Sequence, residues 1–191
     1  MPGATLFPEV IPMPTANPSS PSAAQPSQPP AAKIPPAVSI RELGIGDDAT
    51  SFRTLNEEWI THYFSMEDKD RELLSDPERT ILRRGGRIFI ARANGEDAGC
   101  VALIPMGEGR YELSKMAVKP QMRGLGIGRT LLQRAIVEAC AAGARSLFLG
   151  SNSRLKPAIA LYESAGFRHV PPSQLPEMAY SRANVFMELP L

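Results

Sequence analysis

The stretch from Gln121 to Thr130 constrains this chain most, because three glycines at alternate positions separate an apolar run from a helix-periodic one. Glycine has no Cβ, so its backbone can approach a ligand closely and adopt dihedral angles that other residues avoid. Several backbone N–H groups can then point at one anion, and the helix that follows adds its positive N-terminal end. The segment is therefore a candidate phosphate cradle, although a tight strand-to-helix turn has a similar composition.

The flanks of this loop predict a crossover between two parallel strands. An alternating stretch over 111–118 precedes the loop, apolar residues recur at helical spacing from Leu131 to Cys140, and 146–150 returns as an apolar run. Gly143 is a suitable C-terminal cap for the helix. A strand, helix and strand in this order place the two strands side by side and parallel.

The rest of the pattern alternates strands and helices. We expect strands at 38–43, 87–93, 99–105, 167–170 and 185–189, and helices at 49–64, at 68–82 with an interruption at Pro77, and at 157–165. Asp48 is the expected N-cap of the first helix, and Asn94-Gly95 has the composition of a tight hairpin turn. The pattern predicts an α/β fold with a mixed, mostly antiparallel sheet flanked by helices.

Residues 1–37 differ in composition from the rest of the chain. They hold eleven of the 19 prolines, many Ala and Ser residues, and only two charged residues, Glu9 and Lys33. Such a segment buries too little apolar surface to offset the entropy lost on ordering, so we expect a disordered tail ahead of one folded domain at 38–191. A proline-rich recognition motif is the alternative.

Charge and hydropathy exclude several classes of protein. The 21 basic and 20 acidic residues leave a net charge of +1, so nothing indicates nucleic-acid binding by charge. The apolar runs are too short to span a bilayer, and no signal or transit peptide is recognisable, so we expect a cytoplasmic protein without a membrane partner. Cys100 and Cys140 occupy apolar strand and helix positions and are expected as buried free thiols, with no disulfide framework and no metal site.

Three motifs occur in fixed order: Glu112-x-x-x-Met116-Ala117-Val118, Gln121-x-x-Gly124-x-Gly126 and Leu161-Tyr162-Glu163-x-x-Gly166-Phe167. Together they resemble the GNAT superfamily of acyl-CoA-dependent N-acyltransferases over about 38–191, and the Glu-Leu-x-Lys-Met-Ala-Val strand is similar to one subgroup. A Rossmann dinucleotide loop is the rival interpretation, but the glycine spacing differs, the loop lies late in the domain, and no acidic residue ends a following strand. A Walker loop would need Gly-Lys-Ser/Thr, which is missing.

The resemblance implies a splayed parallel strand pair that holds acetyl-CoA. The backbone of Met116, Ala117 and Val118 would pair with the pantetheine arm. The pyrophosphate would be bound by the loop and the helix start, that is by Gln121, Arg123, Gly124, Leu125, Gly126, Ile127, Gly128, Arg129 and the Thr130 hydroxyl. Many family members carry an asparagine where this chain has Leu155, and Asn152 and Lys156 are the candidates to replace it.

Acyl transfer from a thioester to an amine needs a base, polarisation of the carbonyl and a proton for the leaving thiolate. Glu112 resembles the catalytic glutamate of histone-acetylating GNAT members and is the expected base, directly or through water, on the same strand face as Ser114 and Met116. Tyr162 matches a tyrosine near the cofactor sulfur and is the expected general acid, with the Val118 N–H as oxyanion donor. The alternative interpretation of Glu112 is a carboxylate at the sheet edge with a structural partner. The alternative for Tyr162 is a tyrosine that only packs in the core.

The resemblance thus implies transfer of an acetyl group from acetyl-CoA to a primary amine of a small molecule or peptide, without a metal. Six acidic residues would favour a cationic acceptor, unless they are simply the outer faces of surface helices: Glu57, Glu58, Glu67, Asp68, Asp70 and Glu72. Two rival functions stay open, namely a catalytically silent acyl-CoA sensor or interaction module, and a protein lysine or N-terminal acetyltransferase. A homodimer is a further expectation, since small GNAT domains are often dimers.

Overall fold

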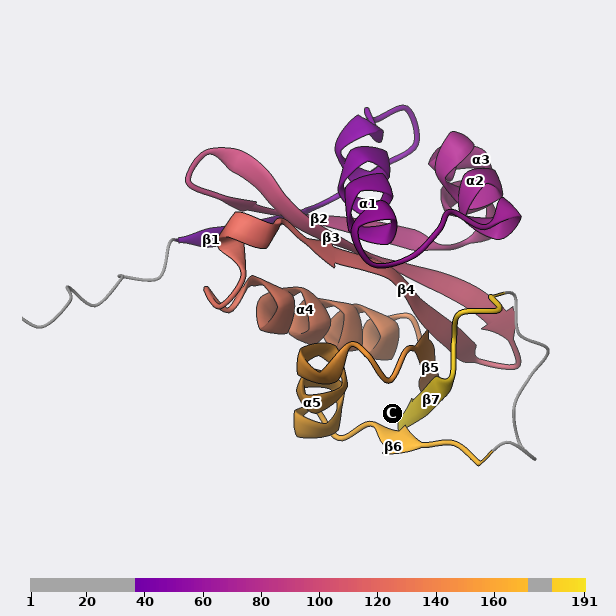
Figure 1. The fold of residues 1–191 in the computed structure, drawn as a ribbon. Coiled ribbons are helices and arrows are strands. Elements are labelled where there is room, and N and C mark those ends of the chain that lie inside the picture. Colours follow the sequence, from indigo (N-terminus) through magenta and orange to yellow (C-terminus); the bar gives the residue numbers. More distant parts are fainter. Residues whose placement is uncertain (1–36, 172–179) are drawn as a thin grey trace, which may run out of the picture. The chain divides into compact units, whose positions relative to one another are not determined.

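A computed structural model describes residues 37–171 and 180–191 of the chain (Figure 1). The tail predicted over 1–37 lies outside these residues, apart from residue 37. Within the described part, no helix is long and apolar enough to cross a membrane.

Seven strands form one sheet in the order β1-β2-β3-β4-β5-β7-β6. Neighbouring strands are antiparallel except for β4 and β5, which are parallel as the crossover predicted. The strands are β1 Val38–Glu42, β2 Arg87–Ala93, β3 Glu96–Gly107, β4 Arg110–Val118, β5 Ser146–Ser151, β6 Arg168–His169 and β7 Val185–Pro190. The predicted α/β class with a mixed, mostly antiparallel sheet is confirmed.

Helices cover both faces of the sheet (Figure 1). They are α1 Thr50–Tyr63, α2 Asp68–Ser75, α3 Pro77–Thr80, α4 Ile127–Ala141 and α5 Lys156–Ser164, with 3-10 turns at Leu82–Arg84 and Pro120–Met122. Alternation along β2 divides the core, since Ile88 and Ile90 pack in the α1 cluster while Phe89 and Ala91 pack in the α4 cluster. The sheet therefore separates two packed layers, one under α1 and one under α4.

Local sequence signals predicted several ends of helices and strands, although the strand expected at 99–105 spans Glu96–Gly107. Pro77 divides the second helical stretch, and Asn94 and Gly95 have the positive φ angles, 51° and 81°, that a tight hairpin turn requires. The first helix begins one residue later than expected, with Ala49 in the cap position. Asp48 still accepts a hydrogen bond from the Thr50 N–H at 2.8 Å, so its side chain satisfies a free donor at the helix start.

The strands β4 and β5 pair over three positions and then separate. The paired positions are Arg110 with Ser146, Tyr111 with Leu147 and Glu112 with Phe148. Beyond them, β4 continues to Val118 while β5 pairs with β7 on its other side. The opening between the two strands is the splayed parallel pair that the family resemblance implied.

A bulge in β4 changes which way its side chains point. Ser114 lies opposite Ala102, but Ala117 lies opposite Cys100, so β4 carries one extra residue there. Lys115 lies in this bulge and has a left-handed φ of 52°. Met116 consequently packs in the α4 cluster, whereas Glu112 and Ser114 lie on the α1 face. The prediction that Met116 shares a face with Glu112 and Ser114 is wrong, because strict alternation ignores the bulge.

The two cysteines differ in burial. Cys100 is buried under α1, as expected. Cys140 is exposed, so the prediction of a buried thiol is wrong for this residue. On α4 the side chains of Leu132, Ala135 and Ala139 face the sheet, and Cys140 is rotated about 100° past Ala139 at the edge of that stripe.

Candidate active site

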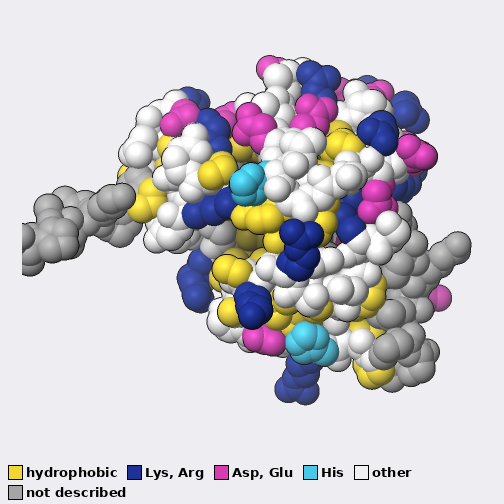
Figure 2. Space-filling view, in the orientation of Figure 1, with side chains coloured by type: hydrophobic (Ala, Val, Ile, Leu, Met, Phe, Trp, Pro, Cys, Tyr) yellow, Lys and Arg dark blue, Asp and Glu magenta, His cyan; other side chains and the backbone are white. Residues whose placement is uncertain are grey.

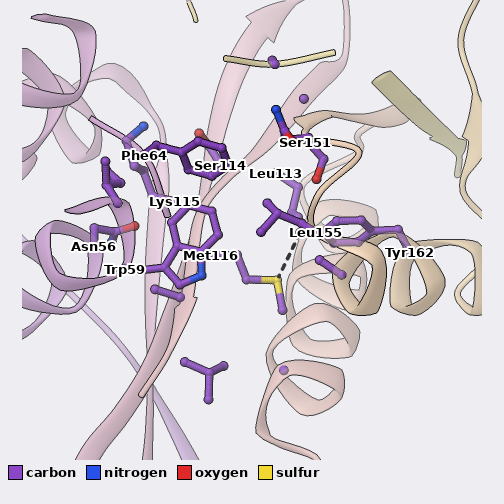
Figure 3. A pocket seen from close by; sticks show the side chains of 18 of the residues that line it. Asn56, Trp59, Phe64, Leu113, Ser114, Lys115, Met116, Ser151, Leu155 and Tyr162 are labelled. Atoms are coloured by element: carbon purple, nitrogen blue, oxygen red, sulfur yellow. Dashed lines mark hydrogen bonds between the residues drawn. The ribbon is translucent and has the colours of Figure 1, made fainter. Parts of the chain in front are cut away.

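A cavity of about 280 Å³ opens where β4 and β5 separate (Figure 3). Its walls come from β4 between Glu112 and Val118, from α1, from the start of α5 and from residues 180–183. Figure 2 shows apolar side chains in the hollow between α1 and the helices α4 and α5, with basic side chains around it. A shallower groove at the start of α4 continues the cavity, because Val118, Arg123 and Gly128 line both.

The backbone of Val118 faces the opening. The Lys119 N–H donates to the Ala98 carbonyl at 2.9 Å, so Val118 and Gly99 form a non-hydrogen-bonded pair of the antiparallel ladder. The N–H and C=O of Val118 therefore point away from β3 toward the cavity. The Arg123 Nε donates to this carbonyl at 3.4 Å. An extended ligand placed beside β4 would find both groups in position to pair as a strand does.

The glycine loop ends as the N-terminus of α4. Gly124 and Gly126 have φ angles of 78° and 82°, which other residues rarely adopt, and Gly126 is the N-cap without a described side chain to cap the helix. Gly128 has ordinary helical geometry instead. A Cβ on Gly128 would lie 3.5 Å from Met116 Cε, an ordinary van der Waals contact, so neither the dihedral angles nor the space at this position require glycine. Of the three glycines, Gly124 and Gly126 thus adopt the backbone angles expected of glycine, and Gly128 does not.

The predicted cofactor residues divide into three groups. Those lining the cavity are Met116, Ala117, Val118, Arg123, Gly128 and Asn152. Those lining the adjoining groove include Gly124, Gly126, Ile127 and Arg129. Neither is lined by Gln121, Leu125, Thr130 or Lys156. Within this last group, the Thr130 hydroxyl donates to the Gly126 carbonyl at 3.2 Å inside its own helix.

Asn152 is already engaged by the protein. Its Nδ2 donates to the Arg182 carbonyl at 2.7 Å, and its Oδ1 accepts from the Arg154 N–H at 2.9 Å. Leu155 lines the cavity at the position where the family resemblance implied an asparagine. The side chain of Asn152 would have to break these bonds to take over that role.

Comparison with known proteins decides the family. A family model described as an acetyltransferase (GNAT) domain matches residues 84–169. An uncharacterized N-acetyltransferase of Schizosaccharomyces pombe is 30% identical over 156 residues, which cover 78% of this chain and 95% of that protein. The chain belongs to the GNAT acetyltransferase family. It is accordingly an acyl-CoA-dependent N-acyltransferase.

Solved structures share the fold of this GNAT acetyltransferase. A GNAT acetyltransferase from Staphylococcus aureus superposes with a TM-score of 0.70 at 23% identity, covering 80% of this chain and 98% of that one. One from Elizabethkingia anophelis, with acetyl-CoA bound, has a TM-score of 0.60 at 21% identity and covers 81% and 98%. Membership of the GNAT family sets aside the dinucleotide and Walker interpretations of the glycine loop.

Tyr162 of this GNAT protein lies on the α4 side of the cavity. It is 8% exposed, and its hydroxyl donates to Met116 Sδ at 3.9 Å (Figure 3). Burial raises the pKa of the Tyr162 phenol to about 12, so the hydroxyl keeps its proton at neutral pH. The bulge brings the two residues together, since it turns Met116 to this face.

Glu112 lines the cavity from the α1 side. Its strand lies in the middle of the sheet, so the alternative interpretation as a sheet-edge carboxylate is wrong. Among the described residues, none donates a hydrogen bond to its carboxylate or forms an ion pair with it. The half-buried carboxylate is thus available to a proton or a ligand in the cavity.

A buried ion cluster that the sequence did not reveal adjoins the cavity, which Lys115, Tyr180 and Arg182 line. Asp70 of α2 is 0% exposed and accepts two hydrogen bonds from Arg182, at 2.6 and 2.8 Å, and one from Lys115 Nζ at 3.1 Å. Tyr180 accepts another from Lys115. Burial opposes ionisation of Asp70, but the Arg182 hydrogen bonds and the Lys115 charge outweigh it and lower the pKa of Asp70.

The expected acidic field does not face the cavity. Glu57 and Glu58 are exposed on α1, Asp70 is neutralised in the ion cluster, and Glu67 binds the backbone N–H groups of Ser181 and Arg182. Among the described lining residues, the carboxylate is that of Glu112, and the cations are Lys115, Arg123 and Arg182. The charges in the cavity therefore do not form the strongly anionic site that the sequence suggested.

Proposed function

We propose that this GNAT protein transfers an acetyl group from acetyl-CoA to a primary amine. The observation that carries the proposal is the Val118 backbone, which turns its N–H and C=O into the opening between β4 and β5. An extended pantetheine arm can lie there as an added strand and donate to the Val118 C=O, which leaves the Val118 N–H for the thioester carbonyl. The pyrophosphate would accept hydrogen bonds from the N–H groups at the start of α4, which the Gly124 and Gly126 dihedrals expose.

The residues around the opening supply the chemistry of a direct transfer. The neutral amine attacks the thioester carbonyl, the C–N bond forms as the C–S bond breaks, and the Val118 N–H stabilises the oxyanion. Tyr162 holds a proton that it can donate to the leaving thiolate and regain from solvent. The proton lost by the amine goes to Glu112.

Glu112 would act through water. It pairs with Ile104 on β3, while Val118 pairs with Gly99, five residues along the same strand. At about 3.3 Å per residue, these positions are roughly 16 Å apart along the sheet, which is longer than a glutamate side chain. A water chain along the α1 face of β4 would connect the carboxylate to a nitrogen held near Val118.

Mass spectrometry of the products formed from acetyl-CoA and a mixed pool of amines and peptides tests the proposal. We expect acetylated small primary amines, together with CoA binding detected by calorimetry. Acetylation of peptides alone would favour the protein acetyltransferase. Binding of CoA without any acetylated product would favour the silent sensor.

A further inference from the structure

The side chain of Asn56 on α1 offers an unused hydrogen-bond acceptor to the cavity. It is 2% exposed, and its Nδ2 donates to the Phe52 carbonyl at 2.9 Å and to Cys100 Sγ at 3.2 Å. The Phe52 carbonyl can only accept a hydrogen bond, so the Asn56 atom that contacts it must be the amide nitrogen. The Oδ1 therefore points into the cavity (Figure 3), and no described residue donates to it.

This oxygen lies at the cavity wall, where a ligand N–H can replace the water that would otherwise hydrogen-bond to it. The position of Asn56 suits an acceptor nitrogen. Its amide contacts Cys100, which pairs with Ala117, the residue before Val118. A nitrogen bound by Asn56 Oδ1 would thus lie next to the backbone proposed to hold the thioester carbonyl.

The charges of the cavity restrict the rest of the acceptor. Lys115 and Arg182 line the α1 side, and a second positive charge on the acceptor would be repelled by them. Their counter-charges, Asp70 and Glu67, do not line the cavity. A polyamine is therefore a poor match for this site.

An apolar wall stands beside Asn56. Trp59 and Ile60 follow it on α1, and Phe64 is the C-cap of the same helix. All three line the cavity, and the rings of Trp59 and Phe64 are 5.9 Å apart. A small apolar body, above all an aromatic ring, would replace water against these side chains.

We propose that Asn56 is a specificity-determining residue that binds the acceptor nitrogen, and that the acceptor is a primary monoamine with an aromatic or similarly apolar body. This inference rests on the proposed acetyl transfer. A neutral primary amine has two N–H groups, one for Asn56 Oδ1 and one for the water that leads to Glu112, while its lone pair attacks the carbonyl. A secondary amine has one N–H and cannot serve both.

Steady-state kinetics with acetyl-CoA and phenethylamine, N-methylphenethylamine or spermidine test the inference. We expect a kcat/KM for phenethylamine at least about tenfold above that for spermidine, since burial of a ring favours the former. Asn56→Leu should raise the KM for phenethylamine about tenfold, the effect of one lost hydrogen bond at the upper end of its usual range. It should also reduce the preference for the primary over the secondary amine.

Two variants and one binding measurement distinguish a loss of amine recognition from a general disturbance of the protein structure. Asn56→Asp keeps an acceptor oxygen and should retain more of the acceptor affinity than Asn56→Leu, while Glu57→Gln, exposed on the same helix, should behave as wild type. The Kd for CoA should be the same in all three variants. An Asn56→Leu enzyme with unchanged amine preference, or a wild type that prefers spermidine, would overturn the inference alone. A wild type that binds CoA but acetylates no amine would overturn the proposed function and the inference with it.

Discussion

Removal of the Asp70 charge should destabilise the folded protein strongly. The carboxylate is 0% exposed and accepts hydrogen bonds from two cations, and the Lys115 side chain is itself only 4% exposed. Asp70→Asn keeps the shape but leaves Lys115 without a counter-charge, whereas Arg182 retains Glu67 at 3.2 Å. Breaking a buried ion pair from one side typically costs about 3–5 kcal/mol. We expect a loss near the lower limit, because Arg182 keeps its second partner.

Urea unfolding followed by circular dichroism measures this loss. With a slope of about 2 kcal/mol per molar urea, a loss of about 3 kcal/mol moves the midpoint down by roughly 1.5 M. Asp68→Asn is the matched control, since Asp68 is fully exposed on the same helix and its pair with Arg71 at 3.5 Å should contribute less than about 1 kcal/mol.

The pH dependence of stability gives a second measure of the same carboxylate. The folded-state pKa of Asp70 is lowered, so its contribution is present above the unfolded pKa of about 4 and is lost as the pH falls through the folded value. Asp70→Asn should lack this loss. If Asp70→Asn and Asp68→Asn had the same midpoint, the ion cluster would contribute little, and the reasoning from burial would be refuted.

Three further variants test the site. Glu112→Gln should lower kcat by about 10²-fold or more and leave CoA affinity unchanged, and an unaltered rate from pH 6 to 9 would exclude Glu112 as the base. Tyr162→Phe should lower kcat at unchanged CoA affinity. It should also reduce the loss of stability that wild type shows above about pH 10, where the unfolded phenol ionises but the buried one, with its raised pKa, does not; Tyr180, whose pKa burial also raises, accounts for a remaining part of that loss. Gly126→Ala and Gly46→Ala place a side chain at similar φ angles, 82° and 89°, with open space around both, so each should cost about 1 kcal/mol. Only Gly126→Ala should weaken CoA binding in calorimetry, and equal Kd values would contradict a cofactor role for the loop.

Local chemistry explains what could be predicted in advance. The glycine loop, its helix and the parallel strands on either side follow from residues close together in the chain, whose dihedral preferences and periodicity act over a few positions. The family motifs are equally local, and so Glu112, Tyr162 and the Val118 backbone were named from the sequence and are found around one cavity.

The residues on the α1 side of the cavity could not be predicted in this way, because their contacts join distant parts of the chain. Lys115 meets Asp70 from 45 residues away, and Arg182 meets it from 112 residues away. No spacing in the sequence signals such pairs, and Asp70 consequently looked like one of six surface carboxylates. Asn56 looked like an ordinary helical residue, since its burial depends on Cys100 of another element.

The sequence by itself determined the sheet class, the crossover and the left-handed glycines ahead of α4, because hydrophobic periodicity and glycine dihedrals are properties of short segments. The tertiary structure alone decided the direction of the Met116 side chain, the exposure of Cys140 and the composition of the α1 wall of the cavity. The register of β4 against β3 creates the bulge at Lys115, and this register depends on contacts across the sheet. Side-chain direction beyond that point is therefore a property of the packed sheet and not of the strand that carries it.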